Sequence, residues 1–150
     1  MSGTSLDFSR NELYRVLTKI ETNTYEIPKS FRNYMRVPVR IYMSKKLLDE
    51  TEDGAIQQAM NVASLPGIEK WSIMLPDAHW GYGFPIGGVA AFPLDEGVIS
   101  PGGIGYDINC GVRFLISEFT IGDVKAKLED LLRALARNIP AGVGRGGHLK

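Results

Sequence analysis

Two short segments of the 150-residue chain carry side chains that can do chemistry, and the first is Asp107-Ile108-Asn109-Cys110-Gly111. A carboxylate three residues from a thiol can contact one ion when the intervening backbone turns, and the neighbouring glycines permit such a turn. A metal lowers the pKa of a thiol, and a thiolate sulfur can bridge two ions. This donor pair suits a divalent transition metal better than Mg²⁺. The spacing alone leaves open that Cys110 is a small buried hydrophobe.

The second segment is Asp77-Ala78-His79, which follows the apolar run Ser72–Leu75. An aspartate at the end of a strand can orient a thiolate or a metal-bound water without binding the metal itself. The alternative is that Asp77 caps a turn after Pro76 and that His79 makes a structural hydrogen bond. A third hypothesis makes Cys110 a nucleophile, but neither His79 nor His148 has a supported position beside it as a base.

Helical patterns flank this region. Ser9 and Glu12 form a capping box, and the apolar spacing predicts a helix over residues 10–20. Asp53 is expected to cap a second helix through residue 63, which stops before Pro66-Gly67. The clearest amphipathic stripe predicts a third helix that ends near residues 138–140, and its members are Val124, Leu128, Leu131, Leu132 and Leu135.

Strand patterns lie between these helices. Alternation from Met35 to Ile41 predicts a half-buried strand, and Pro38 within it indicates an edge position. Three short apolar runs predict buried strands: Ser72–Leu75, Ile86–Phe92 and Val112–Phe119. Helices around a strand-rich centre predict an α+β domain.

The amino-acid composition excludes several classes of protein. The 17 basic and 17 acidic side chains cancel, which argues against a protein that coats nucleic acid through general charge. One cysteine excludes an internal disulfide framework and a four-cysteine zinc site. No run approaches the roughly 18 apolar residues of a membrane span, and the first ten residues lack a secretory pattern. We therefore expect one soluble cytoplasmic domain.

The centre of the chain, residues 71–116, holds few charges and about half of the 17 glycines. Arg113 is its only permanent positive charge, so we expect it to pair with a carboxylate or to face a phosphate. Four aromatic side chains of this region can stack on bases, or pack in the core or at its rim: Trp71, Trp80, Tyr82 and Phe84.

Two long motifs of this central region resemble the amino-terminal part of the RNA-splicing ligase family called RtcB. They read LPDAHWGYGFPIGGVAAF over residues 75–92 and GVISPGGIGYDINCGVRFL over residues 97–115. The shorter runs NVASLPG and IPAGVG, over residues 61–67 and 139–144, also resemble that family. The resemblance covers about residues 35–147 and implies an RtcB-like fold that is incomplete here.

The resemblance implies a ligase for tRNA splicing and RNA repair that depends on GTP and two Mn²⁺ ions. Such enzymes join an RNA 3'-phosphate or 2',3'-cyclic phosphate end to a 5'-hydroxyl end through a guanylated histidine. RNA is the implied substrate, and an archaease-type activator protein is an implied partner. By the same resemblance, Asp107 binds one metal ion, Cys110 bridges both, and Asp77 has an orienting role beside them.

Members of the family are much longer, and their nucleophilic histidine and other metal-binding histidines correspond to positions beyond residue 150. We therefore expect residues 35–150 to be the truncated amino-terminal part of a catalytic domain, preceded by an unassigned helical extension over residues 1–34. The isolated chain is expected to be inactive as a ligase. The alternative is a non-catalytic metal- or RNA-binding fragment of the same family.

Overall fold

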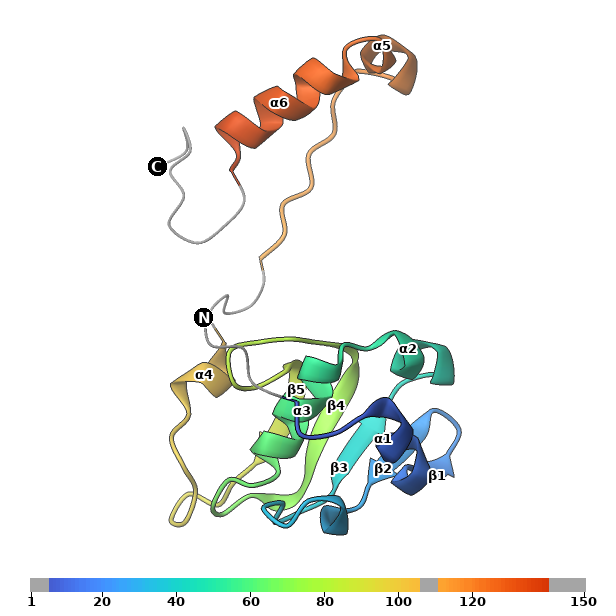
Figure 1. Ribbon diagram of the computed structural model, residues 1–150. Coiled ribbons are helices and arrows are strands. Elements are labelled where there is room, and N and C mark those ends of the chain that lie inside the picture. The colour runs from blue at the N-terminus through green and yellow to red at the C-terminus, as the bar shows by residue number, and fades with distance from the viewer. Residues whose placement is uncertain (1–5, 106–110, 141–150) are drawn as a thin grey trace. The chain divides into compact units, whose positions relative to one another are not determined.

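The computed structural model describes residues 6–105 and 111–140 (Figure 1). The chain divides into two compact units, Met1–Gly111 and Val112–Lys150. The described part of the first unit contains, in order, α1 (Arg10–Val16), β1 (Thr18–Glu21), β2 (Thr24–Ile27), the 3-10 helix η1 (Lys29–Phe31), β3 (Val39–Tyr42), α2 (Lys45–Glu50), α3 (Asp53–Val62), β4 (Glu69–His79), β5 (Ile86–Ala91) and α4 (Pro101–Ile104). The second unit contains α5 (Ile121–Lys125) and α6 (Leu128–Asn138).

A single mixed sheet organises the first unit. Its strand order is β1-β2-β3-β4-β5, with β3 and β4 parallel and every other neighbouring pair antiparallel. The parallel pair needs a crossover connection, which α2 and α3 supply. Figure 1 shows α3 lying across β4 and β5, the two strands that it contacts. The predicted α+β class is therefore confirmed, and because β2 pairs with β3, the chain on both sides of residue 34 shares this sheet.

One face of the sheet packs on the helices. In β3 the side chains of Val39 and Ile41 are fully buried, in a core that includes Leu13 of α1, Leu48 of α2 and Met60 of α3. This alternation follows from the two-residue side-chain period of a strand. The intervening Arg40 lies on the opposite face. There its guanidinium contacts the Glu26 carboxylate at 2.6 Å and the Trp71 ring at 4.7 Å from the centroid.

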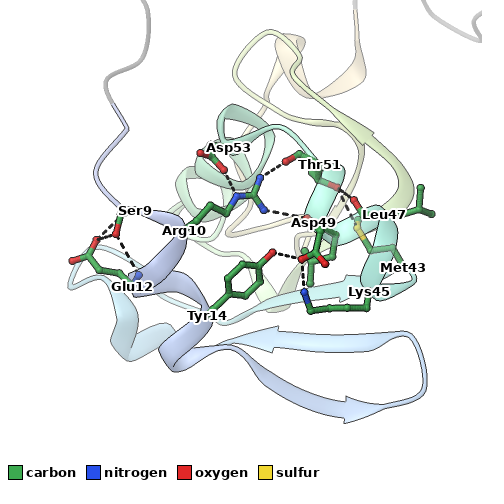
Figure 2. Close-up of polar contacts among 11 residues, drawn as sticks. Ser9, Arg10, Glu12, Tyr14, Met43, Lys45, Leu47, Asp49, Thr51 and Asp53 are labelled. Atoms are coloured by element: carbon green, nitrogen blue, oxygen red, sulfur yellow. Dashed lines mark hydrogen bonds and ion pairs between the residues drawn. The ribbon is translucent and has the colours of Figure 1, made fainter.

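Polar contacts fasten α1 to the connection between α2 and α3 (Figure 2). The Arg10 guanidinium donates hydrogen bonds to the Leu48 carbonyl at 3.0 Å, to the Thr51 carbonyl and to the Asp53 carboxylate. The Leu48 and Thr51 carbonyls lie at the C-terminal end of α2, where backbone oxygens have no hydrogen-bond donor within the helix. At the start of α1 the predicted capping box of Ser9 is present.

The first predicted helix ends earlier than the sequence indicated. Instead of reaching residue 20, α1 stops at Val16, because Leu17 adopts an extended conformation and Thr18–Glu21 pairs with β2. The segment before residue 35 is thus helical at α1 but continues as a hairpin, turned at Asn23 with a φ of 58°. Strand pairing with β2 is therefore favoured over the helix that the apolar spacing up to Ile20 predicted.

Other details of the predictions are wrong. The strand predicted from Met35 begins only at Val39, and it is not at an edge, since β3 lies between β2 and β4. Pro38 is tolerated because it precedes Val39, the first residue of the strand, and so removes no ladder donor. Asp53 does not cap α3 but is its first residue, and Glu52 occupies the cap position.

The strand predicted over Val112–Phe119 is not formed. These residues have no regular secondary structure, and Phe114 is 86% exposed. In the described part of the second unit the regular elements are helices, so this run has no strand there to pair with. The amphipathic stripe, by contrast, does form helix, but it is divided between two helices: Val124 lies in α5, and Leu128, Leu131, Leu132 and Leu135 lie in α6.

Candidate functional site

The structure places Asp77 but not its predicted companions. Asp77 is exposed and lies three residues from the start of the β4–β5 loop, within β4. Asp107, Cys110 and His148 lie outside the described residues, so their predicted roles stay predictions. Arg113 is exposed and forms no ion pair with the residues that the structure describes.

A bulge in β4 sets the position of Asp77. Met74 pairs with Gly88 and His79 pairs with Ile86, so Leu75–Ala78 faces only one residue of β5, Gly87. Extra residues in one strand bend it and re-aim its side chains, and such bulges often lie beside functional sites. Pro76 fits inside the bulge because its missing N–H removes no regular ladder bond. Asp77 is therefore part of an irregular strand and does not cap a turn.

Gly87 is the residue that admits the Asp77 side chain. Its φ is +70°, and a Cβ built on it would lie 2.5 Å from Asp77 Oδ1 and 3.0 Å from the Ala78 nitrogen. Real Cβ atoms do not approach other atoms so closely, so any larger residue would displace the carboxylate or the strand. Gly87, the fifth residue of the sequence GFPIGG, is therefore required at this position for a steric reason.

His79 lies beside Asp77 and has a defined ring orientation. Its Nδ1 donates a hydrogen bond to the Asp77 carbonyl at 2.8 Å. In the neutral ring this leaves the lone pair on Nε2, the nitrogen that can accept a proton or a metal. The structural hydrogen bond that the sequence allowed for His79 is therefore present, and it does not use Nε2.

A cavity of about 430 Å³ lies beside the β4–β5 loop. It is bordered by glycines of β5 and α4 and by aromatic side chains, of which Trp80 is 46% and Tyr82 60% exposed. Neither aromatic is a core residue, but Trp80 packs at the rim of the core, where its ring lies against Gly54 of α3. Trp71, which the sequence grouped with them, instead packs under Arg40.

Two residues that contact this loop, Gln58 of α3 and Glu52 at its N-cap, were not identified from the sequence. Gln58 is 3% exposed and its side-chain amide forms two hydrogen bonds to Gly81, while Glu52 accepts one from the Trp80 nitrogen at 2.8 Å. The available signal was Gln57-Gln58, two amides within an apolar helical pattern. Buried amides need partners, but their partners cannot be read from helical spacing.

The largest resolved pKa change lies in a different cluster. Burial, together with a hydrogen bond to Asp7, raises the pKa of Tyr34 to about 12. The Tyr34 hydroxyl donates to Asp7 at 2.6 Å and accepts from Gln57 at 3.0 Å. Since this phenol is held neutral and tied to the segment before α1, it stabilises the fold and supplies no acid or base to the loop.

The described ranges contain neither a complete metal cluster nor a membrane helix. Within residues 6–105 and 111–140, no group of three or more His, Cys, Asp or Glu side chains is arranged to hold a metal ion. Among those same residues, no helix combines the length and apolar composition that crossing a membrane requires.

Comparison with known proteins gives the family. The family model described as "tRNA-splicing ligase RtcB" matches residues 58–150. The chain belongs to the RtcB family. A tRNA-splicing ligase RtcB of Pyrobaculum aerophilum is 54% identical over 135 residues, and that of Archaeoglobus fulgidus is 50% identical over 135 residues. A third RtcB, from Methanocaldococcus jannaschii, is 58% identical over 95 residues, which are 63% of this chain and 10% of that protein.

The chain spans 28% of the length of the Pyrobaculum and Archaeoglobus RtcB proteins, while these matches cover 89% and 90% of the chain. The RtcB family match includes Asp77 and the β4–β5 loop. The candidate site described above therefore lies in the part of the chain that carries the family's sequence.

Proposed function

We propose that this chain supplies the amino-terminal part of an RNA ligase that joins 3'-phosphate or 2',3'-cyclic phosphate ends to 5'-hydroxyl ends. Membership of the tRNA-splicing ligase RtcB family is the observation that carries the proposal. The reaction uses GTP and a guanylated histidine, which gives the RNA phosphate a good leaving group. The proposed substrate is RNA such as tRNA halves, the fold is RtcB-like, and an archaease-type protein is a proposed activator.

Asp107 and Cys110 are the proposed metal ligands of this chain. Their donor set fits a divalent transition metal, because a carboxylate suits Mn²⁺ and a thiolate can bridge two ions. When bound, Mn²⁺ ions neutralise phosphate charge and align the attacking and leaving oxygens. Two side chains cannot complete the coordination of two ions, so further ligands must come from elsewhere in the complete protein. In the proposed cytoplasmic location Cys110 stays reduced.

Asp77 is the proposed orienting residue. Its carboxylate is exposed, and Gly87 behind it leaves room for that position. A hydrogen-bond acceptor beside a metal site can hold a ligand or a bound water in place. Removing such an acceptor typically lowers metal affinity or activity by about 10- to 100-fold. His79 uses Nδ1 for its hydrogen bond to the Asp77 carbonyl, and we propose no metal-binding role for it.

The alternative is a non-catalytic metal- or RNA-binding fragment. The exposed Trp80 and Tyr82 are the observation that favours it, since aromatic side chains can stack on the bases of single-stranded RNA. The two functions can be distinguished by measurement. A ligase forms a phosphodiester bond between two RNA ends, whereas a binding module binds RNA without joining it.

The test is an RNA-joining assay on the complete gene product of the locus that encodes this chain. Two RNAs, one ending in a 2',3'-cyclic phosphate and one beginning with a 5'-hydroxyl, are incubated with GTP and Mn²⁺. We expect a joined product, a loss of at least about 100-fold with Cys110→Ala, and a loss of about 10- to 100-fold with Asp77→Asn. Retention of RNA without joining would support the binding module instead.

A further inference from the structure

We propose that Gln58 of α3 and Glu52 at the N-cap of α3 are positioning residues that hold the β4–β5 loop and, through it, the Asp77 carboxylate. The proposal rests on the proposed function only in assigning Asp77 to the ligase site. The hydrogen bonds themselves are independent of that assignment. No side chain of α3 is proposed to touch substrate.

The contact between Gln58 and Gly81 has the pattern of a strand pair. Gln58 Nε2 donates to the Gly81 carbonyl at 2.7 Å, and Gln58 Oε1 accepts from the Gly81 nitrogen at 2.9 Å. The side-chain amide therefore satisfies both backbone groups of one loop residue. Gln58 is 3% exposed and Gly81 is half-buried, so removing the Gln58 amide would leave the partly buried N–H and carbonyl of Gly81 without these partners.

Glu52 adds a second attachment one residue earlier in the loop. It occupies the N-cap position of α3, yet its side chain does not cap that helix. Instead its Oε2 accepts the Trp80 nitrogen at 2.8 Å. This acidic side chain thus serves the loop instead of its own helix.

Gly54 allows the loop to approach α3 this closely. A Cβ built on Gly54 would lie 2.3 Å from Cε3 of the Trp80 ring, so the indole rests directly on the helix backbone. Most residues of α3 are buried, which makes the helix a rigid support for the two hydrogen-bonding side chains.

The attachment reaches Asp77 through close backbone contacts. A Cβ on Gly81 would lie 2.2 Å from the Phe84 carbonyl oxygen and 3.2 Å from the Ile86 nitrogen, so Gly81 lies against the start of β5. The next residue, Gly87, is the one that abuts Asp77 Oδ1. A shift of Gly81 therefore moves the residues that define the space around the Asp77 carboxylate.

The chain offers a matched control in the adjacent Gln57. It is also 3% exposed and also hydrogen-bonded, but to Asp7, Tyr34 and Asn61 on the side away from the loop. Gln57→Met and Gln58→Met remove the same chemical groups from the same helix. A purely structural role predicts the same behaviour for both, whereas a positioning role predicts a difference confined to the loop.

The local readouts are amide hydrogen exchange of residues 79–84 and acrylamide quenching of Trp80, measured in a Trp71→Phe background. We expect Gln58→Met to speed loop exchange about tenfold and to increase quenching, and Gln57→Met to change both less than twofold. Glu52→Ala, at an exposed position that does not threaten folding, should have a smaller effect of the same kind. Glu52→Gln, which keeps an acceptor for the Trp80 nitrogen, should restore wild-type values.

The functional readout is RNA joining by the complete gene product. We expect Gln58→Met to lower kcat about tenfold with KM for RNA within twofold of wild type, and Gln57→Met to leave both within twofold. Equal loop exchange in the two glutamine variants, or failure of Glu52→Gln to restore what Glu52→Ala loses, overturns the proposal. If wild type joins no RNA, the proposed function fails while loop exchange still decides whether α3 holds the loop.

Discussion

Replacing Gly87 with alanine tests whether the β4 bulge and the Asp77 carboxylate require a glycine opposite them. The substitution has two costs. A left-handed φ of +70° costs an L-residue about 1–2 kcal/mol. The new Cβ would also lie 2.5 Å from Asp77 Oδ1, and relieving such an overlap in a packed site costs about 1–3 kcal/mol. We therefore expect Gly87→Ala to lower the free energy of unfolding by about 2–5 kcal/mol.

Gly83 provides the control for this experiment. Its φ is also positive, +93°, but a Cβ built on it would have nothing within 4 Å. Gly83→Ala should therefore show only the backbone cost of about 1–2 kcal/mol. If the free energy of unfolding falls by about 2 kcal/mol per molar urea, the urea midpoint of the Gly87 variant should be about 1 M lower than that of the Gly83 variant. Unfolding of both variants is followed by far-UV circular dichroism. Equal urea midpoints for the two variants would refute the steric argument.

Three further predictions concern other parts of the chain. Since folding raises the pKa of Tyr34 from 10 to about 12, its hydroxyl stabilises the fold fully below pH 10 and loses this effect as the pH rises towards 12. Tyr34→Phe should thus be less stable than wild type at pH 8 in urea titrations, and a gap that does not narrow by pH 11.5 would contradict this. Arg10→Met should lower the free energy of unfolding by about 2 kcal/mol, since it leaves the carbonyls at the end of α2 without their donor; unchanged urea midpoints would argue against that role. Leu132, 57% exposed on α6, should promote association of the 150-residue chain, so Leu132→Lys should shift its sedimentation towards monomer while Arg133→Lys should not.

The elements that the sequence predicted well are those with local signals. Helix α3 and the helix α6 follow from apolar residues repeating at helical spacing, and β5 follows from a short apolar run between glycines. The hairpin of β1 and β2 was missed because all four residues of β1 are exposed and lack strand alternation, while Ile20 continues the helical spacing of α1. Its stability comes from pairing with residues that the local sequence does not specify.

The sequence identified Asp77 as a candidate residue, but it did not show the geometry around that residue. Asp77 was identified from a motif, and its position in a bulge depends on which residues of β4 and β5 pair, which is a tertiary property. The same is true of Gln58, whose partner Gly81 lies 23 residues along the chain. Helical spacing can show that a side chain is buried, but it cannot show which loop receives its hydrogen bonds.

The most direct test of the account is covalent labelling by GTP radiolabelled on its α-phosphate. The complete gene product and the isolated 150-residue chain are each incubated with the labelled GTP and Mn²⁺, denatured and separated by electrophoresis. We predict a labelled protein band for the complete product, its loss with Cys110→Ala, and no label on the isolated chain, whose imidazoles are His79 and His148. A labelled 150-residue chain, or a complete product that takes up no label, would contradict the proposal that this chain carries only part of an RNA ligase site.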